Sequence, residues 1–104
     1  MPWMRFTLVT PVPGAAEEVL RLLNQLEEAT AGLPGFVMGG VFTDSEATDR
    51  LGRFAIWSSR DDADKASSVD RVLSVRAELQ RRIEEGRLES LFEVSGTSHN
   101  LPSG

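Results

Sequence analysis

Along the chain, hydrophobic and polar residues alternate in four short segments and recur at helical spacing in two longer ones. The alternating segments are rich in β-branched and aromatic residues and cover residues 3–10, 35–43, 50–57 and 88–95. A period of two is typical of β-strands, whereas apolar residues that repeat every three or four positions indicate an amphipathic helix. The helical spacing covers residues 15–31 and 60–85. The pattern therefore predicts the order β-α-β-β-α-β.

Residues near the second predicted helix refine its boundaries. Ser59, with Asp62 three residues later, is typical of a helix N-cap with a partner in the first turn. A break near Ser67 and Ser68 divides the helix into a short and a long part. Gly86 is expected to cap its C-terminal end, because glycine is favoured just after the last helical turn.

The predicted order is that of the ferredoxin-like split βαβ fold, an α+β architecture with both helices on one face of a four-stranded antiparallel sheet. In the second strand, the residues that point to either face of the sheet are apolar, so both faces of this strand are expected to be buried. Gly39-Gly40 marks a bulge or a close approach of another group to the backbone. The uncovered face then carries many apolar side chains, taken from Phe54, Ile56, Val37 and Val41 or their neighbours of opposite parity. We therefore predict a homodimer that packs sheet against sheet.

Length and composition limit the possible partners. The chain has 104 residues, which predicts one domain over residues 1–97 and a flexible polar tail over residues 98–104. Lys and Arg total 11 against 16 Asp and Glu, a net charge of −5, which argues against nucleic acid and anionic membranes as partners. The absence of Cys excludes thiolate chemistry and fits a reducing cytoplasm. No stretch approaches the roughly 18 apolar residues that would span a bilayer.

Three motifs give the chain a family resemblance. Leu33-Pro34-Gly35-Phe36 leads the second strand, Phe54-Ala55-Ile56-Trp57-Ser58-Ser59 ends the third, and Leu91-Phe92-Glu93-Val94 closes the last. With them, residues 3–96 resemble the antibiotic biosynthesis monooxygenase family of the dimeric α+β barrel superfamily. The resemblance implies oxidation of a small planar aromatic or quinol by oxygen, with no metal, flavin or other cofactor. It also implies a ligand cleft between the sheet and the helices, lined by Trp57.

Trp57 and Arg53 are the candidate catalytic residues of that cleft. The indole of Trp57 offers a large apolar face on which a flat substrate can stack. Arg53 lies on the same side of the third strand and can stabilise negative charge on the substrate. Each residue also has a simpler interpretation: Trp57 packs the helices onto the sheet, and Arg53 pairs with a nearby acid.

Four further residues are candidates for substrate binding. Arg5 and Thr7 share one face of the first strand by the period of two, so they point into the cleft together or lie together at the sheet edge. Phe36 and Met38 fit an apolar wall of the cleft, although residues of this type at strand spacing are more often plain core.

Other features argue against a metal site and leave the reaction open. Family members of the oxygenase type carry an Asn near the Trp, whereas the asparagines of this chain are Asn24 and Asn100, far from Trp57 in the sequence. Haem-degrading relatives bind iron through a His on the helix after the third strand, but the sole histidine of this chain is His99. The acidic cluster at residues 61–64 suits the first turn of a helix better than a metal.

Two arginines and a threonine suit an anionic ligand but supply no base with a pKa near 7. A monooxygenase, a non-catalytic dimeric ligand-binding or stress-associated module, and a cofactor-free isomerase or cyclase therefore remain open.

Overall fold

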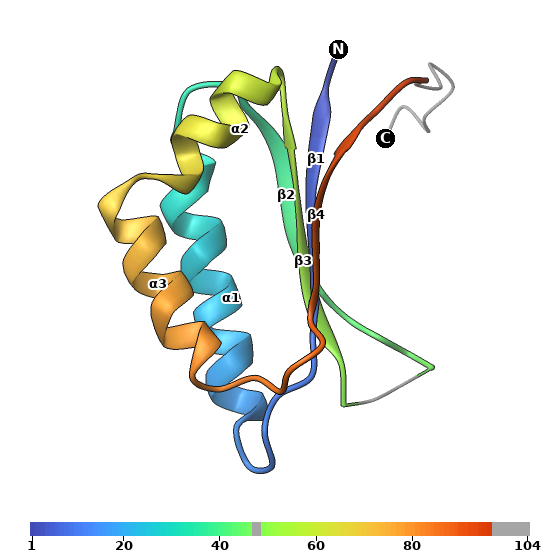
Figure 1. The fold of residues 1–104 in the computed structure, drawn as a ribbon, viewed down its shortest axis with the longest axis vertical. Helices are drawn as coiled ribbons and strands as arrows, with labels where there is room; N and C mark the ends of the chain where they lie inside the picture. Colours follow the sequence, from blue (N-terminus) through green and yellow to red (C-terminus); the bar gives the residue numbers. More distant parts are fainter. Residues whose placement is uncertain (47–48, 97–104) are drawn as a thin grey trace, which may run out of the picture.

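The computed structural model describes residues 1–46 and 49–96, which form one four-stranded sheet and three helices. The strands are β1 (Trp3–Val9), β2 (Phe36–Thr43), β3 (Leu51–Trp57) and β4 (Leu88–Glu93), and the helices are α1 (Ala16–Ala31), α2 (Arg60–Ser67) and α3 (Asp70–Gln80). All strand pairs are antiparallel, in the order β2-β3-β1-β4. The helices lie on one face of the sheet and leave the other uncovered (Figure 1). The predicted ferredoxin-like α+β fold is confirmed.

The main core lies between α1, α3 and the sheet. Both helices contribute their apolar stripes to one cluster with strand residues, which contains Val9, Val19, Leu22, Leu23, Leu26, Leu51, Val72, Val75 and Leu79. Burying each leucine or valine side chain of this kind stabilises the fold by roughly 1.5–3 kcal/mol. A second, smaller cluster under α2 joins Trp57 to Ala55, Ala63 and Ala66. The small alanine side chains let α2 approach the Trp57 ring.

The second predicted helix is two helices, as the break near Ser67 and Ser68 indicated. The N-cap at its start is confirmed, because the Ser59 hydroxyl accepts a hydrogen bond from the Asp62 amide at 3.1 Å. The predicted end at residue 85 is wrong, since α3 ends at Gln80. The backbone beyond it bridges to the loop after β1, where Ile83 pairs with Pro11. Gly86, with φ of +88°, therefore turns the loop into β4 instead of capping the helix.

The uncovered face is apolar, but its members differ in part from the prediction. Phe54 and Ile56 lie on it, whereas Val41 pairs with Arg53 in register and packs against the core on the helix side. The register shifts between Phe36 and Met38, so one extra residue reverses the parity of the rest of β2. The bulge therefore lies before Gly39, and Met38 joins Ile56 on the uncovered face.

Gly39 permits a close approach instead of forming the bulge. A Cβ atom at this position would lie 2.7 Å from a carboxylate oxygen of Glu27 and 2.8 Å from the carbonyl oxygen of Phe54. The missing side chain thus lets Glu27 of α1 reach down to the sheet. Among the described residues, no helix has the length and apolarity to cross a membrane.

Candidate functional site

A small cavity lies between the sheet and the helices, close to the break between α2 and α3. Its lining comes from β1, β3 and all three helices, and consists of Arg5, Leu26, Thr30, Arg53, Trp57, Ala63, Ala66, Ser67, Val72 and Arg76. The cavity has a volume of about 10 Å³, room for about one water molecule. This volume is too small for a planar aromatic ligand.

Trp57 is the largest apolar residue that lines this cavity. It is the last residue of β3, and its side chain is only 2% exposed. The Phe36 ring meets it edge to face, with ring centroids 5.4 Å apart and planes at 81°. This geometry is favourable for aromatic pairs and fixes the orientation of the indole. Trp57 therefore both packs against α2 and lines the cavity.

Arg53 is buried in a network that joins β3 to α1. It is 3% exposed; its Nε donates a hydrogen bond to Oε1 of Glu27 at 2.9 Å, and a terminal nitrogen donates to the Thr30 hydroxyl. The Thr30 hydroxyl in turn donates to the Leu26 carbonyl at 3.0 Å. Burial lowers the pKa of Arg53, and the Glu27 carboxylate opposes this shift. The side chain remains a cation, because arginine does not lose its proton in proteins.

Arg5 and Arg76 bring two more positive charges to the same cavity. Burial and the neighbouring Arg76 lower the pKa of Arg5. The nearest carboxylate oxygen to Arg5 belongs to Asp64, at 3.9 Å, and Arg60 shares that carboxylate. Every charged residue in the described lining is thus an arginine. The cavity favours an anion, although the whole chain carries a net charge of −5.

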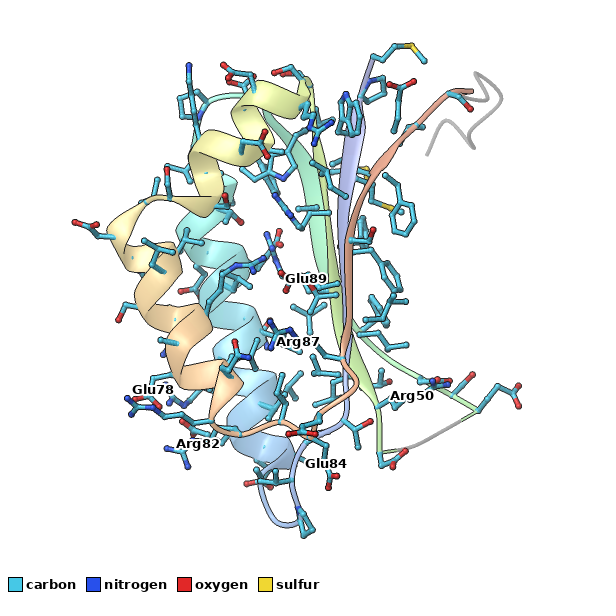
Figure 2. All side chains as sticks on the ribbon, in the orientation of Figure 1. Arg50, Glu78, Arg82, Glu84, Arg87 and Glu89 are labelled. Carbon is cyan, nitrogen blue, oxygen red and sulfur yellow. The ribbon has the colours of Figure 1, made fainter. Side chains whose placement is uncertain are left out.

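Arg76 separates this cavity from a second one of about 20 Å³. The second cavity lies toward β4 and is lined by Thr7, Val9, Arg76, Leu79, Gln80, Ile83, Arg87 and Glu89. Figure 2 shows Arg87 and Glu89 projecting from the β4 side into the space between sheet and helices. A terminal nitrogen of Arg76 contacts Oε1 of Glu89 at 2.7 Å, while the buried Nε of Arg76 has no hydrogen-bond partner.

The structure brings together part of the site predicted from sequence. Trp57, Arg53 and Arg5 line one cavity, and Thr7 lines the adjacent one. Phe36 lies behind Trp57 and supports its ring. Met38 lies on the opposite face of the sheet and is 54% exposed. The expectation that it forms a wall with Phe36 is wrong, because the bulge between the two residues turns Met38 away.

The sequence interpretation missed the partners that the helices and β4 contribute. Thr30 and Arg76 each lie four residues after a buried apolar residue, Leu26 and Val72, and therefore on the inward face of their helix. A polar side chain on an otherwise apolar stripe was the available signal. Glu27 and Glu89 gave no comparable signal, because their partners come from distant parts of the chain.

Metal-binding and amide groups are not assembled at the cavity. Among the described residues, no three His, Asp or Glu side chains gather to hold a metal ion. Asn24 is exposed on α1, where its side-chain amide donates to the Leu20 carbonyl at 3.0 Å. His99, Asn100 and the predicted tail lie outside the described residues.

Several solved structures share this architecture. SnoaB, a cofactor-independent oxygenase from Streptomyces nogalater, matches in a mutant form with a TM-score of 0.82 and 19% identity, over 92% of this chain and 95% of that one. A structure named antibiotic biosynthesis monooxygenase matches with a TM-score of 0.79 and 16% identity, over 90% of this chain and 99% of that one. The chain has the fold of the antibiotic biosynthesis monooxygenases. Rv0793 from Mycobacterium tuberculosis matches with a TM-score of 0.86 and 16% identity, over 94% of this chain and 99% of that one.

These similarities establish the monooxygenase-type fold alone. The chemistry has to be inferred from the residues that line the cavity. No family model matches the sequence, and neither does any curated protein. Within the monooxygenase-type fold, this chain places three arginines beside the Trp57 ring. That arrangement is the basis for a proposal on function.

Proposed function

We propose that the protein is a cofactor-independent monooxygenase that oxidises a small planar aromatic or quinol with oxygen. The main support for this proposal is that Trp57 lines one cavity between the sheet and the helices together with Arg5, Arg53 and Arg76. The shared fold with SnoaB, which is named a cofactor-independent oxygenase, supports the same reaction class.

In this proposal the arginines stabilise the ionised substrate. A phenol, hydroquinone or anthrone that loses a proton becomes electron-rich, and fixed positive charge in a site with little water favours that anion. Trp57 stacks on the ring system, and Arg5 and Arg76 supply donors to the anionic oxygen. Arg53 is already bonded to Glu27 and Thr30, so it contributes charge to the cavity and no free donor.

The substrate itself supplies the electrons for the reaction. For an anthrone, the ring CH₂ group and one O₂ give a quinone carbonyl and one water. One oxygen atom enters the product, and the other leaves in water with both hydrogens. The substrate anion transfers electrons to oxygen, and the resulting peroxide eliminates water. The protein's part is to bind the substrate, hold it as the anion and exclude bulk water.

We also infer that ligand binding is coupled to movement, because the cavity is too small for the proposed substrate. Ligand sites for small molecules commonly have volumes of about 300–1,000 Å³, far above the volume present here. The backbone break at Ser68 and Val69 separates α2 from α3, and it is the natural hinge for opening. Binding then requires that α2 or α3 moves relative to the sheet.

The first experiment is oxygen uptake by metal-free protein with a panel of anthrones, hydroquinones and naphthols. We expect uptake with at least one member, and a loss of about tenfold or more in Trp57→Phe, because the smaller ring gives less stacking area. Trp3→Phe is the matched control, since this second tryptophan contacts the exposed Arg60 and does not line the cavity.

Absence of uptake across the panel, in protein shown to be folded, would contradict the oxygenase proposal. It would favour the alternative of a ligand-binding module without turnover. One observation fits that alternative: the described lining holds no histidine or carboxylate that could serve as a general base. Binding of the same compounds without their oxidation would decide for it.

A further inference from the structure

Helix α3 and strand β4 are connected across the cavities by one side-chain ion pair. The apolar side chains of α3 pack on α1 in the main core. Toward β4, a terminal nitrogen of Arg76 meets Oε1 of Glu89 at 2.7 Å. Below this pair, the loop after α3 is attached to the loop after β1, since the Val12 amide donates to the Arg82 carbonyl at 2.9 Å and the Glu84 amide to the Thr10 carbonyl at 2.7 Å.

Arg76 is only partly satisfied by this contact. Glu89 occupies one terminal nitrogen, whereas the buried Nε has no partner. A guanidinium can bind a carboxylate through two parallel hydrogen bonds, which makes such a pair stronger and more specific. Arg76 therefore keeps donor capacity, and it lines the Trp57 cavity as well as the second one.

The charges around Arg76 favour exchange of its anionic partner. Arg53 has Glu27 as a close carboxylate, at 2.9 Å. Arg5 has Asp64 at 3.9 Å and also feels the charge of Glu89. Glu89 is the acid that pairs with Arg76, and its side chain is 25% exposed. Arg87 and Glu89 both line the second cavity, so Arg87 can receive the Glu89 carboxylate.

We propose that Glu89 is an intramolecular occupant of the position that the ligand's anionic group takes. An aromatic carboxylate or phenolate displaces Glu89 from Arg76, and Glu89 turns toward Arg87 or the solvent. The exchange breaks the contact between α3 and β4 and so opens the cleft as it fills the anion position. This proposal rests on the proposed function, because it concerns the ligand of the same site.

The test measures binding of two matched probes by calorimetry. The probes are 2-naphthoate, which is an anion at neutral pH, and 2-naphthamide, its neutral counterpart of nearly equal shape. We expect wild-type protein to prefer naphthoate. Glu89→Gln should bind naphthoate about tenfold more tightly, because the internal competitor has lost its charge. Its gain for naphthamide should be much smaller, because the neutral probe profits only from the easier opening of the cleft.

The matched control is Glu93→Gln on the same strand. Glu93 pairs with Trp3 in the sheet register and is exposed, so its substitution removes the same charge away from Arg76. We expect a change below twofold. The double variant Arg76→Gln/Glu89→Gln, which leaves no unpaired charge between α3 and β4, should prefer naphthoate less than Glu89→Gln does, because the Arg76 donor is gone while Arg5 and Arg53 still line the cavity.

Two outcomes would overturn the proposal. One is an equal gain for naphthoate in Glu89→Gln and Glu93→Gln, which would show a general charge effect. The other is wild-type protein that binds neither probe or shows no preference between them. Failure of the oxygenase proposal looks different: oxygen uptake is absent, yet naphthoate binding keeps its dependence on Glu89 and Arg76.

Discussion

At the scale of single residues, the site depends on a buried arginine that needs its carboxylate. Arg53 is 3% exposed and has Glu27 as its close anionic partner. Moving an ion pair out of water is costly, and removing one member leaves the other charge buried without compensation. The pair therefore contributes position and charge to the cavity more than it contributes net stability.

Replacing Glu27 by Gln should lower the free energy of unfolding by about 2 kcal/mol or more, because it leaves the Arg53 charge without its anion. The double variant Glu27→Gln/Arg53→Met should recover part of this loss, since it also removes the buried charge. Urea denaturation of the three proteins measures both effects. Glu28→Gln, at the exposed neighbouring position of α1, is the control and should stay within about 0.5 kcal/mol of wild type. Equal losses at the two positions would show that Glu27 has no special role.

At the scale of elements, the sequence predicted what depends on local pattern. Apolar and aromatic residues dominate β3, and α1 carries an apolar stripe that Thr30 interrupts in its last turn, so both elements were predicted within one or two residues. The Ser59 cap was also a local signal. Local pattern could not predict the end of α3, because long-range backbone pairing with the Pro11 loop determines it.

The same limit explains the errors at β2 and at the site. The bulge after Phe36 turns Met38 to the opposite face of the sheet. The hydrophobic pattern did not reveal this bulge, because residues on both faces of β2 are apolar. Trp57, Arg53 and Arg5 could be grouped because they lie on adjacent strands at even spacing. Arg76 and Glu89 join them only through the packing of α3 over the sheet and the placement of β4 at its edge.

Gly39 controls how α1 is seated on the sheet. Gly39→Ala should lower the free energy of unfolding by about 1–3 kcal/mol, because the new Cβ meets the Phe54 carbonyl and displaces the Glu27 carboxylate. For a domain of this size, 1 kcal/mol corresponds to about 4–8 °C in the melting temperature, which calorimetry resolves. Gly32→Ala is the control, since no atom lies within 4 Å of its added Cβ and φ is −95°. Equal melting temperatures for the two variants would contradict the seating role.

At the scale of the whole molecule, one face of the sheet carries no covering layer. The paired positions on it carry no charged residue in the described strands: Met4, Phe6, Leu8, Met38, Gly40, Phe42, Gly52, Phe54, Ile56, Leu88, Ser90 and Phe92. Two chains of net charge −5 repel each other least when they meet through an uncharged surface. We therefore propose that a second copy covers this face in a homodimer.

Phe92→Asp should convert that dimer into a monomer. Phe92 is 43% exposed on the uncovered face, and a carboxylate there would be buried without a partner in the dimer. Light scattering after size exclusion, across a range of concentrations, measures the mass of each species. Leu73→Asp is the matched control, because Leu73 is 50% exposed on α3, and it should leave the mass unchanged. Wild-type protein that stays monomeric at all concentrations would contradict the dimer.

A monomeric Phe92→Asp that still binds 2-naphthoate would show that each chain holds a complete site between its own sheet and helices, as the lining residues lead us to expect.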